Sequence, residues 1–149
     1  MPEVRFYHLQ RITLEQALPR LLEKILDRGW RAVVLANSDE RIDRLTQTLW
    51  TYDSASFLPH GDRRDGMAER QWVWLTAVEE NPNGAQVLVL TDGASAQRLE
   101  SFSLVCDVFD GNDSTALSAA RERWRRCKSA GCSLTYWQQT ENGGWVQKA

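Results

Sequence analysis

Residues 32–36 read Ala-Val-Val-Leu-Ala, and residues 37–40 continue with Asn-Ser-Asp-Glu. A short apolar run bounded by polar residues is typical of a strand that is buried on both faces. Ser38 is a suitable N-cap for a helix, and the two acids after it lie where the helix dipole favours negative charge. We therefore predict a buried strand over residues 31–36 and a helix that runs from there to about Trp50.

A similar strand and helix precede this segment. Residues 4–8 resemble a short strand, and the capping box formed by Thr13 and Gln16 opens an apolar-periodic helix that reaches about Asp27. Pro19 lies just beyond the first turn, so the helix either bends there or becomes regular only from that residue. Strand, helix, strand, helix at this spacing requires crossover connections, which indicate a mostly parallel sheet covered by helices.

The remaining chain continues the pattern. We predict strands over residues 72–78, 86–91 and 103–109, a short helix near residues 94–99, and a long helix that is capped by Asp113 or Ser114 and stops at Gly131. Residues 133–148 alternate around Asn142-Gly143 as in a terminal hairpin. A length of 149 residues suits one domain. We expect a single three-layer α/β domain over residues 1–149, with helices on both faces of the sheet.

The composition of the chain argues against several classes of protein. The formal net charge of -2 argues against a protein whose whole surface binds nucleic acid strongly. The N-terminal residues do not resemble a signal peptide, and no apolar run approaches the length of a membrane span, so we expect a cytoplasmic protein without membrane contact. Cys106, Cys127 and Cys132 have neither zinc-site nor disulfide-framework spacing, and we interpret them as free thiols.

Many α/β chains bind nucleotides, so the presence or absence of phosphate-binding and catalytic motifs bears on function. Neither a Walker-type phosphate loop nor a G-x-G-x-x-G turn occurs in the sequence, and the two histidines, His8 and His60, do not stand at the spacing of metal ligands. We therefore expect no enzyme, no cofactor and no metal. The alternative hypothesis is a nucleotide-binding α/β enzyme that uses Asp92-Gly93 at the end of a buried strand, although such a dipeptide is more often a simple turn.

The long helix near the C-terminus carries the strongest candidate site. Residues 121–128 read Arg-Glu-Arg-Trp-Arg-Arg-Cys-Lys, a net charge of +4 in an acidic chain. Helical periodicity predicts a buried stripe of Leu117, Ala120, Trp124 and Cys127. A basic row lies beside it and consists of Arg121, Arg125 and Lys128. Such a face suits an acidic peptide with an apolar anchor, but a solvated helix end or a small single-stranded nucleic acid platform would also fit.

Trp50 raises a separate question. It lies away from the centre of the apolar face formed by Ile42, Leu45 and Leu49. Together with Phe57, Leu58 and Pro59, it could form an exposed apolar patch for a partner, or it could simply close the edge of the core. The sequence leaves both interpretations open.

Three motifs, in order along the chain, resemble the chi subunit family of bacterial DNA polymerase III. They are Phe6-Tyr7-His8-Leu9; Leu49-Trp50 followed by Ser56-Phe57-Leu58-Pro59-His60; and Ala120-Arg121-Glu122-Arg123-Trp124 running on to Ala130-Gly131. The resemblance implies a non-catalytic accessory subunit of the polymerase holoenzyme in DNA replication, without a nucleotide-binding loop. It would link the clamp-loader complex, through the psi subunit, to the acidic C-terminal tail of single-stranded-DNA-binding protein.

The resemblance also assigns residues to these two contacts. The tail would bind to Arg121, Trp124, Arg125 and Lys128, with Leu117 and Phe109 beside them. The psi subunit would bind to Trp50, Phe57, Leu58 and Pro59. Leu117 stands where better-known members have a lysine, and Trp124 stands where a tyrosine is familiar, so we expect a less basic and more apolar tail site. The stretch from Tyr136 to Ala149, which contains Trp137 and Trp145, has no role that the resemblance assigns.

Overall fold

The computed structural model describes residues 2–53, 58–142 and 144–149. Its elements are β1 (Glu3–Leu9), α1 (Leu14–Asp27), β2 (Ala32–Leu35), α2 (Asp39–Thr51), the 3₁₀ helix η1 (Ala68–Arg70), β3 (Val73–Thr76), β4 (Val87–Thr91), β5 (Leu104–Asp110), α3 (Ser114–Ser129), β6 (Ser133–Gln139) and β7 (Trp145–Gln147). Within these residues, no helix combines the length and apolar character that crossing a membrane requires.

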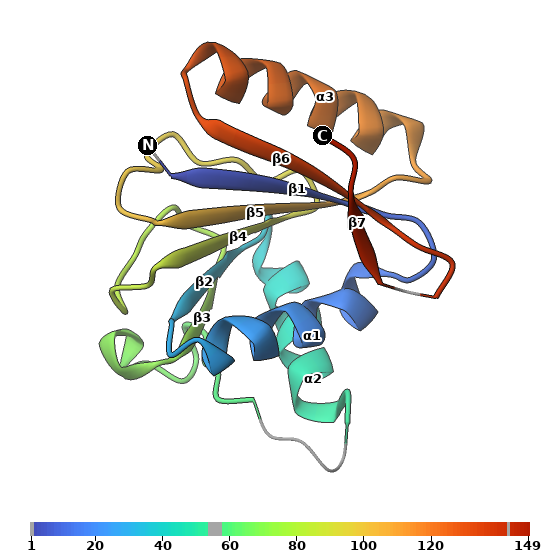
Figure 1. Cartoon of the computed structure of the whole chain (residues 1–149). Helices are drawn as coiled ribbons and strands as arrows, with labels where there is room; N and C mark the ends of the chain where they lie inside the picture. The colour runs from blue at the N-terminus through green and yellow to red at the C-terminus, as the bar shows by residue number, and fades with distance from the viewer. Residues whose placement is uncertain (1, 54–57, 143) are drawn as a thin grey trace.

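The strands form one seven-stranded sheet in the order β3-β2-β4-β5-β1-β6-β7. The pairs from β3 to β6 are parallel, and β6 and β7 form an antiparallel hairpin at one edge. Helices α1 and α2 cover one face of the sheet and α3 covers the other (Figure 1). The predicted α/β class, the mostly parallel sheet, the three layers and the terminal hairpin are therefore confirmed.

The predicted helix starts are confirmed by their caps. The Thr13 hydroxyl accepts a hydrogen bond from the backbone N–H of Gln16, and the Gln16 side chain accepts one from the backbone N–H of Thr13. This reciprocal box lets α1 begin at Leu14, with the buried Pro19 inside the helix. At α2, the Ser38 hydroxyl accepts from the backbone N–H of Arg41 at 3.2 Å.

Residues 94–99 do not form the short helix that we predicted. The chain leaves β4 through a turn in which Asp92 and Gly93 both have positive φ, at 52° and 81°. Ala94 and Phe102 then insert into the core on the α3 side of the sheet. Because a helix of about six residues gains few internal hydrogen bonds, the burial of these two anchors decides the path of the segment.

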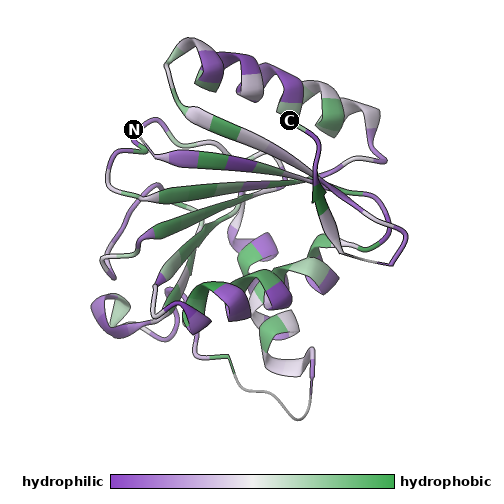
Figure 2. Cartoon of the chain, in the orientation of Figure 1, coloured by the Kyte–Doolittle hydropathy of each residue, from purple (hydrophilic) through white to green (hydrophobic). Residues whose placement is uncertain are grey.

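The core has two layers that the sheet separates. On the α1 and α2 face, side chains such as Tyr7, Leu18 and Leu45 pack together. On the α3 face, Phe6 and Phe109 pack with residues of β2 and β4. Successive residues of a strand point to opposite faces, so Phe6 and Tyr7 belong to different layers. Figure 2 shows the apolar colour along β2, β4 and β5 at the centre of the sheet and hydrophilic colour over much of α3.

A buried ion pair holds α3 against the sheet. The Arg123 guanidinium donates two hydrogen bonds to the Asp107 carboxylate of β5, at 2.6 and 2.9 Å. Both side chains are almost completely buried. Burial raises the pKa of Asp107, and the adjacent guanidinium opposes this by favouring the ionised form. Arg123 is therefore part of the core, and its charge, which we included in the net charge of +4 for residues 121–128, does not reach the exposed face of this helix.

We expect Arg123→Met to destabilise the fold by about 3–5 kcal/mol, because it leaves the Asp107 carboxylate buried without its partner. Urea denaturation followed by circular dichroism measures this loss. Arg126→Met, at an exposed position of the same helix, should change stability by less than about 0.5 kcal/mol. The double variant Asp107→Leu/Arg123→Met should recover most of the loss, because it removes both charges. An equal loss in the single and double variants would contradict the ion-pair explanation.

Candidate functional site

A pocket of about 420 Å³ lies between α3 and the neighbouring strands β1, β5 and β6. The lining residues are Phe6, Phe109, Leu117, Ala120, Arg121, Trp124, Arg125, Tyr136 and Ala149. They come from four elements and from residue 149, so the pocket exists only when the sheet and helix have assembled. We call it the α3 pocket.

Aromatic rings form the wall of the α3 pocket. Trp124 meets Phe6 edge-on, with ring centres 5.4 Å apart, and meets Tyr136 edge-on at 6.1 Å. Phe109 lies 6.3 Å from Tyr136 on the far side. These rings pack against one another with the geometry that aromatic pairs prefer, so the wall is preorganised. Such a niche can receive one apolar or aromatic side chain of a ligand.

Two arginines stand beside this wall. Arg121 is exposed and has no ion-pair partner among the residues that the structure describes. Arg125 is exposed as well and pairs with Glu122 at 3.2 Å, one turn away on the same helix. Since an exposed pair of this kind is weak, Arg125 can exchange Glu122 for a ligand carboxylate. The pocket thus combines an apolar niche with guanidinium donors for an acidic group.

The structure brings together five of the six residues predicted for tail binding: Leu117, Arg121, Trp124 and Arg125 on α3 and Phe109 on β5. Lys128 is exposed further along α3 and does not line the pocket. The sequence did not identify Phe6 and Tyr136 as pocket residues. The register of the parallel pair β1–β6, in which Phe6 lies opposite Tyr136, accounts for their meeting.

His8 lies behind the aromatic wall of the α3 pocket and contacts two of its rings, Tyr136 and Phe109. Its Nδ1 shares a short hydrogen bond with the Tyr136 hydroxyl, and its ring packs against Phe109. Its imidazole also packs against Gly111. A Cβ atom at residue 111 would lie 1.7 Å from His8 Nε2, so only glycine fits at residue 111. Burial lowers the pKa of His8, and the nearby Arg121 lowers it further. A neutral His8 therefore orients Tyr136 without adding charge.

A second candidate surface surrounds the end of α2. Trp50 is 57% exposed, which favours the interpretation that it belongs to a surface patch. Its indole contacts the His60 ring edge-on, with ring centres 4.8 Å apart. Trp72 is 39% exposed and lies under the guanidinium of Arg31. From the sequence we predicted only that a strand begins at this residue.

The other residues predicted for the psi contact differ in their exposure. Leu58 is 2% exposed and belongs to the core, so it can only support the surface from beneath. Pro59 is half-buried and lines a shallow pocket of about 310 Å³ together with Trp72. Phe57 lies outside the described residues. We call the two exposed tryptophans, Trp50 and Trp72, together with the half-buried Pro59, the α2 surface.

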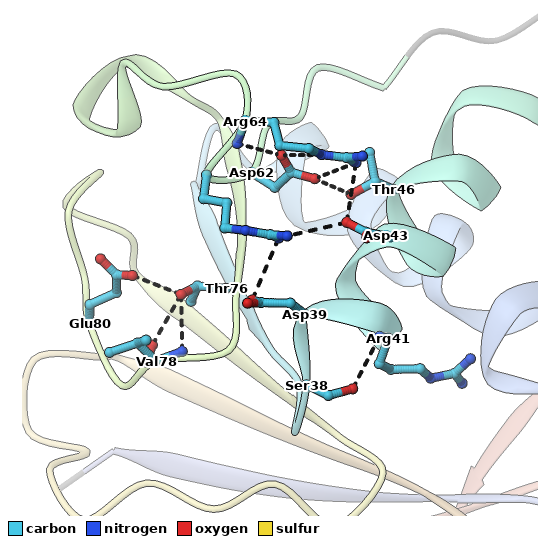
Figure 3. Close-up of polar contacts among 11 residues, drawn as sticks. Ser38, Asp39, Arg41, Asp43, Thr46, Asp62, Arg64, Thr76, Val78 and Glu80 are labelled. Carbon is cyan, nitrogen blue, oxygen red and sulfur yellow. Dashed lines mark hydrogen bonds and ion pairs between the residues drawn. The ribbon is translucent and has the colours of Figure 1, made fainter.

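A polar network ties the loop after His60 to α2 (Figure 3). The Asp62 side chain is fully buried and accepts hydrogen bonds from the Thr46 hydroxyl at 2.9 Å and from the Arg64 guanidinium at 3.0 Å. Arg63 and Arg64 also contact Asp43 of α2. The network holds residues 61–64 against α2 and thus fixes the segment beside His60.

The Asp92-Gly93 turn has a structural partner. The Asp92 carboxylate accepts a hydrogen bond from Arg41 Nε at 2.5 Å, and Arg41 also pairs with Glu15. The Asn37 amide donates to the Asp92 backbone carbonyl at 2.7 Å. The adjacent crevice is lined by three acids and two arginines, namely Glu15, Asp92, Asp110, Arg11 and Arg41. This charge balance and the engaged Arg41 favour a turn over a phosphate site.

Comparison with known protein families agrees with the arrangement of these residues. A family model described as "DNA polymerase III chi subunit, HolC" matches residues 1–135. The chain belongs to the DNA polymerase III chi subunit family. The resemblance recognised in its motifs is thereby confirmed. The matched region contains α3 and the α2 surface, and it ends inside β6, so most of the terminal hairpin lies beyond it.

A curated relative from Rickettsia prowazekii (strain Madrid E) is named "Probable DNA polymerase III subunit chi". It is 32% identical to this chain over 90 residues, which is 60% of this chain and 54% of the relative. The match therefore spans about half of the relative's length.

The Asp62 network generates a prediction about pH. Burial by itself would raise the pKa of Asp62, but hydrogen bonds from Arg64 and Thr46 outweigh it and hold the pKa below its usual range. A carboxylate with a depressed pKa in the folded state stabilises the fold above its ordinary pKa of about 3.9, and this contribution disappears as the pH falls below that value. We expect Asp62→Asn to cost about 1–3 kcal/mol at pH 7 and much less near pH 3.

Urea denaturation of both proteins at the two pH values measures this difference. Asp27→Asn is the matched control, because Asp27 is an exposed carboxylate on α1 and its loss should leave stability nearly unchanged at both pH values. A loss for Asp62→Asn that is equal at pH 7 and pH 3 would show that the charge of Asp62 does not stabilise the network.

Proposed function

We propose that this protein is a non-catalytic adaptor of the DNA polymerase III holoenzyme in DNA replication. In this proposal, the α3 pocket binds the acidic C-terminal tail of single-stranded-DNA-binding protein, and the α2 surface binds the psi subunit of the clamp-loader complex. The observation that carries the proposal is the α3 pocket, in which an aromatic niche and the exposed Arg121 lie side by side in a chi family member.

The chemistry of the α3 pocket suits such a tail. An acidic peptide that ends in an apolar residue needs a place for that side chain and a cation for the terminal carboxylate. Trp124, Phe6 and Tyr136 supply the first, and Arg121 supplies the second through its two-pronged guanidinium. Leu117 lines the pocket where a lysine is familiar, so apolar contact contributes more of the affinity and charge contributes less.

The alternative of a nucleotide-binding enzyme has weaker support. The Asp92-Gly93 turn holds Arg41 between two carboxylates, and neither its sequence nor its geometry provides a cradle for phosphate. A thermal-shift comparison separates the two functions. The tail peptide at about 100 times its dissociation constant should stabilise the fold by about 2.7 kcal/mol, whereas ATP should not shift the melting temperature. The opposite result would favour the enzyme.

For the tail site, we expect Arg121→Ala to weaken binding by about 1–3 kcal/mol, roughly tenfold or more, because the terminal carboxylate loses its fork. Fluorescence anisotropy of a labelled tail peptide with a free C-terminal carboxylate measures the affinity. Arg126→Ala, at an exposed position of α3 outside the α3 pocket, is the matched control and should have little effect. Binding should weaken but persist as salt rises, since screening reduces only the charge pairs.

Two results would contradict the tail site. One is a larger loss for Arg126→Ala than for Arg121→Ala. The other is unchanged affinity after the peptide's terminal carboxylate is converted to an amide, because that change removes the group that Arg121 is proposed to bind.

For the psi contact, we expect Trp50→Ala to weaken binding of the psi subunit by about 2 kcal/mol or more while tail binding stays intact. The side chain is 57% exposed, so its loss should leave the melting temperature almost unchanged. Titration calorimetry with purified psi subunit measures the effect. Val78→Ala, an exposed apolar residue after β3, is the control. A folded variant that binds psi normally would show that Trp50 is not part of this contact, and a variant that unfolds would show that Trp50 is part of the core.

A further inference from the structure

A hollow of about 680 Å³ lies on the face of the sheet opposite to α3. One wall is α1, with Arg20 and Lys24 on its outer side, and the other is the β6–β7 hairpin, with Trp137 and Trp145. Arg5 and Tyr7 of β1 form part of its floor. In Figure 1, β7 extends from the sheet toward the side on which α1 lies. We call this hollow the hairpin groove.

Neither the family match nor the proposed function accounts for this groove. The family model ends at residue 135, whereas Trp137 and Trp145 follow it. The α3 pocket uses Phe6 of β1, and the hairpin groove uses the flanking residues Arg5 and Tyr7, which point to the other face. The two sites are therefore separated by the thickness of the sheet, and the inference does not depend on tail binding.

The groove is apolar and aromatic at its base. Tyr7 stacks on Trp137, with ring centres 6.4 Å apart, and meets Trp145 edge-on at 5.0 Å. Both tryptophans are only half-buried, so each presents part of its ring to solvent. Ile12 and Leu21 of the α1 side also line the groove. Aromatic anchors of this kind dominate the energy of protein contacts once water is excluded.

The charge along the groove is of one sign. Its cationic side chains are Arg5, Arg20 and Lys24, and no aspartate or glutamate is among the described residues that line it. Arg5 is engaged by Glu3 at 2.7 Å. Arg20 and Lys24 are exposed, and neither has an ion-pair partner among the described residues. In a chain of net charge -2, this unopposed basic edge beside an apolar floor is complementary to an acidic ligand.

The ring geometry favours a peptide over single-stranded nucleic acid. A base stacks on an open aromatic face, but Tyr7 stacks against Trp137, and the Arg5 guanidinium lies 5.8 Å from the centre of the Trp137 ring. Trp145 meets Tyr7 edge-on. The stacked contact therefore engages a face of Trp137 within the protein, and the apolar side chains of a peptide can pack against the ring surfaces that stay exposed.

The spacing of the cations favours a helix. Arg20 and Lys24 stand four residues apart on α1 and so point to the same side, about one turn from each other. Carboxylates four residues apart on a second helix lying along α1 would match this separation. We propose that the hairpin groove binds an acidic amphipathic helix of a partner protein, with its apolar stripe on Trp137 and Trp145 and its carboxylates on Arg20 and Lys24.

Nuclear magnetic resonance of the full chain tests this proposal through the indole N–H signals of Trp137 and Trp145. The probe is a designed helical peptide in which a stripe of leucines is flanked by glutamates. We expect it to shift both indole signals while the Trp124 signal stays in place. A matched peptide with lysines in place of the glutamates, and an oligothymidylate, should leave the two signals unchanged.

The double variant Arg20→Glu/Lys24→Glu should weaken binding of the acidic peptide by about tenfold or more, because attraction becomes repulsion. Arg20→Gln/Lys24→Gln should have a smaller effect in the same direction. Both side chains are exposed, so the remaining spectrum should confirm that the variants fold. Arg126→Glu, on α3, changes the net charge by the same amount as Arg20→Gln/Lys24→Gln, and this control should bind the probe normally.

Four results would overturn the proposal. They are absence of any shift with the acidic peptide, equal shifts with the lysine peptide, shifts with the oligothymidylate, and indole signals that move with protein concentration as the chain sediments as a dimer. The third would assign the groove to nucleic acid, and the fourth would assign it to a second copy of this chain. None of these results bears on tail binding, which Arg121 variants report separately.

Discussion

The ion pair between Arg123 and Asp107 determines how α3 lies on the sheet. A guanidinium that donates two hydrogen bonds to a buried carboxylate allows the helix little rotation about its axis. Once Arg123 points inward, the helical period turns Trp124 toward Phe6 and leaves Arg121 and Arg125 exposed beside the rings. The α3 pocket therefore depends on an interaction that lies outside it. The positions of Arg121 and Arg125 follow from the buried arginine Arg123.

The position of β1 between β5 and β6 lets it contribute to two hollows on opposite faces of the sheet. Alternate residues of one strand serve opposite faces, with Phe6 in the α3 pocket and Tyr7 in the hairpin groove. A strand at the edge of the sheet could support neither, because it would lack neighbours on one side. Since the two hollows are on different faces, occupation of one does not obstruct the other, which suits a protein whose proposed role is to connect partners.

Much of the candidate site could be predicted from local sequence. Helical periodicity placed Leu117, Trp124 and the basic row on adjacent stripes, and five of the six predicted residues line the pocket. Periodicity could not identify the inward orientation of Arg123, because that orientation depends on a carboxylate 16 residues earlier in another element. Tyr136 was missed for a similar reason, since its contact with Phe6 and His8 arises from a parallel pairing between strands at opposite ends of the chain.

By itself, the sequence determined the α/β class, the capped starts of α1, α2 and α3 and the motifs of the chi family, because each depends on residues that are close together in the chain. The tertiary structure alone decided the strand order, the non-helical path of residues 94–99 and the two hollows on either side of β1. These features depend on which segments, far apart in the sequence, pack together and bury apolar surface. Such packing cannot be recognised from neighbouring residues in the sequence. The groove beside Trp137 and Trp145 is one of these tertiary features, because its two walls, α1 and the β6–β7 hairpin, lie far apart in the sequence.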